Sequence, residues 1–151
     1  MRRILCGLAA LGCLLLTGCS GLPYAREMGD MALLRTMGVD AAEGELTVTV
    51  STGPRPRGLQ GEGETALTLS AAGTSLSGAL LALQERSGSY LFFGYVDQLL
   101  VGEELARQGA EPVLDYFARD VELGLGAQVW LVRTGTAEDA VRSGGGQGVE
   151  S

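Results

Sequence analysis

The first nineteen residues decide which part of this chain is left to fold as a domain. Arg2 and Arg3 precede an apolar run over residues 4–16, and the small residues Thr17 and Gly18 follow it. A charged start, a short apolar stretch and small residues before a cut are typical of a secretory signal. A transmembrane helix needs about 20 apolar residues, so an uncleaved spanning helix is the weaker interpretation.

The sequence Leu16-Thr17-Gly18-Cys19 resembles the cleavage site of a bacterial lipoprotein signal. The resemblance implies cleavage before Cys19 and lipids on the new N-terminus. Acyl chains contribute about 0.8 kcal/mol per buried methylene, so two or more of them anchor a protein stably. We therefore expect a signal peptide over residues 1–18, a lipidated tether over 19–30, a folded domain over 31–142 and a disordered tail over 143–151.

The residue types that are missing exclude several chemistries. Cys6, Cys13 and Cys19 are the only cysteines, so the domain after Cys19 has no disulfide and depends on packing for its stability. The chain contains neither histidine nor lysine. Their absence excludes a Ser-His-Asp arrangement, a histidine-ligated metal site, a Schiff base and a P-loop. We expect no cofactor and no metal.

The folded part is strongly acidic. Arg2 and Arg3 are the only charged residues before Cys19, so the rest of the chain carries nine arginines against eighteen carboxylates, a net charge of −9. No run of basic residues is present to follow a phosphate backbone. A nucleic-acid partner or electrostatic attraction to anionic lipid is therefore not expected.

Alternating hydrophobicity predicts most of the strands. Leu46, Val48 and Val50 share one face of a half-buried strand, and residues 40–44 and 71–73 are predicted turns. The stretch 90–101 is apolar on both faces, which predicts one interior strand with a bulge at Gly94. The last strand is also predicted to be buried on both faces. The predicted strands cover residues 33–39, 45–50, 65–70, 90–101 and 127–132.

Helical spacing predicts the remaining elements. Leu76, Ala79, Leu80 and Leu83 form one apolar stripe, which Thr74 or Ser75 can cap. A short helix is predicted over 103–108, a second one begins near Pro112, and a last turn over 137–142 follows Thr136. The buried stripe of the second helix is predicted to comprise Val113, Leu114, Phe117 and Ala118.

The predicted order of elements is β-β-β-α-β-α-β-α. This order is typical of a single α/β domain of the mixed α+β kind, with a mixed sheet and helices packed on it.

Candidate site residues are few. Asp97 and Glu103, with Glu104, could supply an acid and a base if their carboxyl groups lay about 5–9.5 Å apart across a cleft, as in a glycan hydrolase. Surface charge is the favoured interpretation. Arg55 and Arg57 lie in a loop over residues 53–63 that is rich in glycine and proline, where solubility is a simpler role than anion binding.

Several segments together resemble a known family. The strongest are Tyr90-Leu91-Phe92-Phe93-Gly94, residues 99–107, residues 113–120, and Val129-Trp130-Leu131-Val132 with Gly135, Ala137 and Asp139 after it. Gly38-Val39-Asp40 and Gly73-Thr74-Ser75-Leu76 are weaker matches. Over residues 19–141 the chain resembles the N-terminal domain of the spore germination lipoprotein C subunit, the GerAC-like family of germinant receptors.

The resemblance implies a non-enzymatic, lipid-anchored subunit on the outer face of the cell membrane or the spore inner membrane. Its implied partners are the membrane, through the lipid on Cys19, and two membrane-embedded receptor subunits that sense nutrients. Family members carry two further domains, so this chain corresponds to the first alone. They also have a histidine where this chain has Tyr95. The alternative is a stand-alone surface lipoprotein that binds a small ligand or cell-wall fragment near Tyr90, Phe93 or Trp130.

Overall fold

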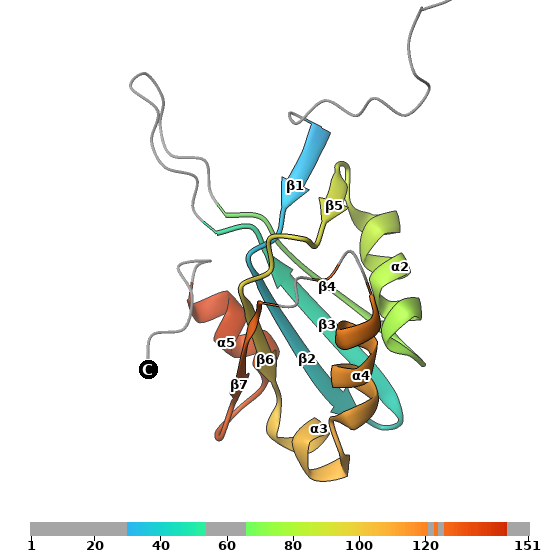
Figure 1. Ribbon diagram of the computed structural model, residues 1–151, viewed down its shortest axis with the longest axis vertical. Coiled ribbons are helices and arrows are strands. Elements are labelled where there is room, and N and C mark those ends of the chain that lie inside the picture. Colours follow the sequence, from blue (N-terminus) through green and yellow to red (C-terminus); the bar gives the residue numbers. More distant parts are fainter. Residues whose placement is uncertain (1–29, 54–65, 121–122, 124–125, 145–151) are drawn as a thin grey trace, which may run out of the picture.

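The computed structural model describes residues 30–53, 66–120, 123 and 126–144 (Figure 1). The expected signal, tether, arginine-containing loop and most of the tail lie outside these residues. The described elements are β1 (Met31–Leu33), β2 (Thr36–Ala42), β3 (Glu45–Ser51), β4 (Thr68–Gly73), α2 (Leu76–Arg86), β5 (Tyr90–Phe92), β6 (Gln98–Val101), α3 (Glu103–Gln108), α4 (Glu111–Arg119), β7 (Gln128–Leu131) and α5 (Ala137–Ser143).

The main sheet has five strands in the order β4-β3-β2-β6-β7. Strands β2, β3 and β4 pair antiparallel, whereas β6 pairs parallel with both β2 and β7. Helices α2, α3 and α4 lie on one side of this sheet and α5 lies on the other (Figure 1). The predicted fold class, a mixed sheet with helices packed on it, is therefore confirmed.

The first hairpin is confirmed, with a shift in its bounds. Glu43 and Gly44 both have positive φ angles, 53° and 85°, and they join Ala42 to its partner Glu45. Two residues with positive φ match the right-handed twist of a hairpin. The predicted turn at 40–44 was too long, because Asp40 still pairs with Thr47 in the ladder.

Strand β3 is covered on both faces, so the prediction of a half-buried strand was wrong. Val48 and Val50 lie in the main core, but Thr49 and Ser51 are fully buried on the opposite face. Helix α5 packs over that face, and Thr49 bonds to Ser70 there at 2.9 Å. Alternation distinguishes the two faces of a strand but does not reveal a helix distant in sequence that covers the polar one.

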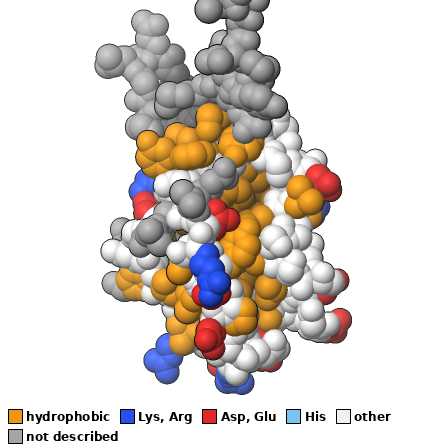
Figure 2. Space-filling view, turned by 45° about the vertical axis from the view of Figure 1, so that its right-hand side comes forward, with side chains coloured by type: hydrophobic (Ala, Val, Ile, Leu, Met, Phe, Trp, Pro, Cys, Tyr) orange, Lys and Arg blue, Asp and Glu red, His pale blue; other side chains and the backbone are white. Residues whose placement is uncertain are grey.

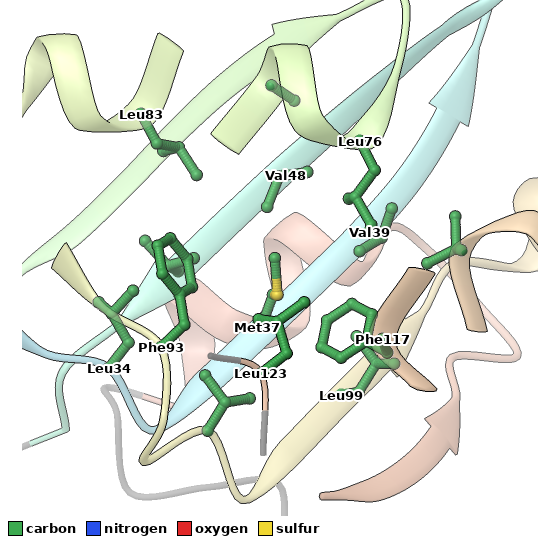
Figure 3. Close-up of a cluster of buried hydrophobic side chains, with 14 of the residues drawn as sticks. Leu34, Met37, Val39, Val48, Leu76, Leu83, Phe93, Leu99, Phe117 and Leu123 are labelled. Carbon is green, nitrogen blue, oxygen red and sulfur yellow. The ribbon is translucent and has the colours of Figure 1, made fainter. Parts of the chain in front are cut away.

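The main core lies between the sheet and the helices on its α2 side (Figure 3). Leu76, Ala79 and Leu83 of α2 are buried as predicted, and the Ser75 hydroxyl accepts a hydrogen bond from Gly78 N. Residues 71–73 continue β4 and form no turn.

In α4 only part of the prediction is confirmed. Val113 and Phe117 are buried, but Leu114 and Ala118 are exposed because the helix presents a narrower face.

The segment 90–101 forms two strands, which corrects the prediction of one interior strand. Strand β5 pairs parallel with β1, and β6 pairs with β2 in the main sheet. Gly94 and Tyr95 form a turn between them, closed by a hydrogen bond from Val96 N to Phe93 O. Both faces of the segment are apolar because its two halves pack against different partners.

Strand β7 is an edge strand with one open face. Val129 and Leu131 are each 56% exposed, whereas Trp130 and Val132 pack against the cluster formed by Leu100 and α5. The predicted burial on both faces was therefore wrong. Helix α5 covers one face of β7, but α2, α3 and α4 do not extend over the other face at this edge of the sheet.

Candidate functional site

The carboxylates considered as an acid and base pair do not form one. Asp97 precedes β6 and accepts a hydrogen bond from Arg35 at 2.7 Å. Glu103 follows β6 and accepts one from Arg107 at 2.6 Å, and Glu104 accepts one from Gln108. Asp97 and Glu103 lie at opposite ends of a four-residue strand, about 13 Å long at 3.3 Å per residue. Each is engaged separately on the surface.

The aromatic residues considered as pocket walls are mostly packed. Phe93 is 9% exposed and belongs to the main core (Figure 3). Trp130 packs against Leu100, Ala137 and Val141. Tyr90 is partly buried in β5. None of the three side chains lines the depression described below along α4.

Asp40 makes a contact that the sequence did not predict. Its two carboxylate oxygens accept hydrogen bonds from the backbone N–H groups of Ala137 and Glu138, at 2.8 and 2.9 Å. These are free donors at the start of α5, where a negative charge is also favoured. The Thr136 hydroxyl accepts a third bond, from Asp139 N. Strand β2 thereby fixes the start of a helix 97 residues later.

A polar network also ties Glu138 and Arg142 of α5 to the sheet. The Ser70 hydroxyl donates to Glu138 at 2.9 Å and contacts the buried Thr49 hydroxyl at 2.9 Å. Arg142 donates to both Ser70 and Glu138, and Arg86 donates to the Ser70 carbonyl. All these donors and acceptors pair within the fold, so the network has a structural role.

One open depression of about 340 Å³ lies along α4. It is lined by Pro112, Asp115, Tyr116, Arg119 and Asp120. Arg119 pairs with Asp115 at 2.9 Å, so its one cation is already engaged within the helix. No acidic or cysteine cluster suited to a metal ion occurs in the described ranges, and no helix there is long and apolar enough to cross a bilayer.

A partly exposed apolar surface belongs to the β1–β5 pair, whose outward side chains are half-buried. Because strand side chains alternate, Ala32 and Leu91 point into the core and are buried. The residues on either side of them share the opposite face. We call this surface, together with the adjoining turn residue, the outer face; it comprises Met31, Leu33, Tyr90, Phe92 and Tyr95.

The outer face is rich in aromatic rings. Phe92 and Tyr95 are in contact, with ring centroids 5.8 Å apart and planes inclined at 60°. Tyr95 is 61% exposed. Hydrophobic side chains gather at the end of the domain where β1 begins (Figure 2). Aromatic residues with one apolar and one wet end are the type enriched at interfaces.

Comparison with protein-family models gives a match. The mixed α/β domain over residues 24–143 matches the family described as the spore germination protein N-terminal domain. The match spans most of the chain and includes every described element. The chain belongs to this family and is a GerAC-like N-terminal domain, which confirms the resemblance seen in the sequence. No curated protein and no solved structure matches it.

Proposed function

We propose that this chain is a lipid-anchored, non-enzymatic accessory subunit of a spore germinant receptor. The observation that carries the proposal is the family match over residues 24–143, preceded by a lipoprotein-type signal that ends at Cys19. A lipid on Cys19 would hold the domain at the outer face of the cell membrane or spore inner membrane. There it would assemble with the membrane-embedded receptor subunits.

The described surface supports a role without catalysis. Asp97, Glu103 and Glu104 each bond to a neighbouring side chain on the surface, and none of them faces another across a cleft. Acid–base hydrolysis needs two carboxyl groups on either side of a substrate bond. Asp40 and Ser70 bond to groups of α5 and hold that helix on the sheet.

The test has a genetic and a biochemical part. Deleting the gene in the spore-forming host should slow or abolish germination with nutrients, and the wild-type chain should restore it. Cys19→Ala should fail to restore germination, leave the membrane fraction and lose the lipid mass on its N-terminal peptide. Cys13→Ala is the matched control, because it removes a signal cysteine that is not at the cleavage site.

Two outcomes would overturn the proposal. Unchanged nutrient germination in the deletion strain would remove the receptor role. An unmodified N-terminus in the wild-type chain would remove the anchor. Co-purification of the wild-type chain with the membrane-embedded receptor subunits, and its loss in Cys19→Ala, tests the assembly separately.

A further inference from the structure

The structure places a partly exposed aromatic surface at strand β1, the first strand after the expected tether. Strand β1 begins at Met31, twelve positions after that cysteine. A twelve-residue segment spans at most about 40 Å when fully extended. A lipid on Cys19 would therefore keep the start of β1 within about 40 Å of the membrane.

We propose that the outer face rests in the lipid interface, with the ring of Tyr95 inserted among the headgroups. The inference rests on the lipid anchor of the proposed function. It assigns the bilayer, and no protein partner, as the surface that covers Met31, Leu33, Tyr90, Phe92 and Tyr95.

The chemistry of the outer face favours lipid. Its five side chains are apolar or aromatic, and none of them carries a formal charge at neutral pH. Tyr95 offers an apolar ring with a polar hydroxyl, which suits the boundary between headgroups and acyl chains. Phe92 supports the Tyr95 ring from one side at 5.8 Å.

The position of the outer face favours lipid over other occupants. It is continuous with the anchored end of the chain, so the tether raises the local concentration of bilayer around it. The chain from Cys19 to Ser151 has a net charge of −9, so electrostatic attraction to anionic lipid cannot orient it. Orientation must then come from burial of apolar side chains, which depends little on lipid charge.

The fold also separates the outer face from the main core. The turn at Gly94 and Tyr95 directs the chain from the small β1–β5 pair to β6 of the main sheet. Phe93 enters the core while its neighbours Phe92 and Tyr95 stay partly or largely exposed. Contact with lipid at Tyr95 therefore requires no exposure of the core.

The experiment uses the mature chain from Cys19 to Ser151, whose single thiol allows coupling to a maleimide lipid in phosphatidylcholine vesicles. Such coupling supplies the anchor chemically, so the result does not depend on lipidation in cells. Trp130 is the only tryptophan and is replaced by phenylalanine. Tyr95→Trp then reports on the outer face in this background.

Leu81→Trp in the same background is the matched control. Leu81 lies on the open side of α2 and is 62% exposed, nearly the same fraction as Tyr95. We expect the emission of the reporter at position 95 to shift to the blue on coupling. Lipids brominated near the headgroup should quench this reporter several-fold more than the reporter at position 81. Adding phosphatidylglycerol should not strengthen the effect.

Equal quenching of the two reporters, or none at either, in chains whose coupling is verified by mass would overturn the inference. The outer face would then be left for a protein partner. Failure of lipidation in cells with preferential quenching at position 95 in vesicles would instead overturn the proposed anchor and leave the lipid preference of this surface intact.

Discussion

Asp40 and Gly102 are in contact where β2 and β6 lie side by side, and a Cβ on Gly102 would occupy the position of the Asp40 carboxylate. The Gly102 N–H donates to the Val39 carbonyl at 2.9 Å, which holds the two backbones together. The same carboxylate binds the first N–H groups of α5. Because Gly102 has no side chain, the Asp40 carboxylate has room to reach the start of α5.

Gly102→Ala should destabilise the domain by about 1–3 kcal/mol, the usual cost of overpacking a filled site. The added methyl group must displace Asp40 from α5. Urea unfolding monitored by circular dichroism measures the change. Gly88→Ala is the control, because a Cβ at Gly88 meets no atom within 4 Å. Equal stability of the two variants would contradict the contact described here.

Asp40→Ala should cost about 1.5–3 kcal/mol, because it leaves donors at a helix start without a charged acceptor. Asp40→Asn should cost less, since its amide oxygen can still accept one of the two bonds. Faster hydrogen exchange at the amides of Ala137 and Glu138 should accompany the loss. Asp115→Ala changes an exposed carboxylate on α4 and should stay within about 0.5 kcal/mol.

Leu83→Ala and Leu81→Ala should differ sharply although both lie on α2. Leu83 is fully buried and Leu81 is 62% exposed. Removing a buried leucine leaves a cavity and costs about 2–5 kcal/mol. Truncating the exposed one should change the free energy of unfolding by less than about 0.5 kcal/mol. Similar losses in thermal unfolding would mean that α2 packs through a different face.

Asp97→Asn and Glu103→Gln should leave nutrient germination unchanged in a complemented deletion strain. Both carboxylates form exposed ion pairs, with Arg35 and Arg107. Exposed pairs contribute at most about 1 kcal/mol, so the folded population should hardly change. Loss of germination in either variant, with normal protein levels on immunoblots, would point to a chemical role for that carboxylate.

Local signals in the sequence were enough for many elements. The short helix α3 spans the predicted residues. Helix α2 begins after Ser75, one of its two predicted caps, and α5 begins after the predicted cap Thr136. These features depend on neighbours within a few positions, such as a hydroxyl before a helix. The family pattern also lies in the order and spacing of residues, and the match over 24–143 confirms it.

Contacts between distant segments decided the rest. Alternation in β3 did not reveal that α5 buries Thr49, and helical spacing in α4 did not reveal that Leu114 stays exposed. The apolar stretch 90–101 contains two strands because its halves meet β1 and β2 separately.

The sequence by itself determined the local elements, the expected anchor at Cys19 and the family of the domain. Only the tertiary structure decided which apolar side chains remain uncovered and that Asp40 holds the start of α5. The physical reason is that burial and capping across 97 residues depend on which surfaces the packed sheet brings together, and periodicity in a single segment carries no record of them.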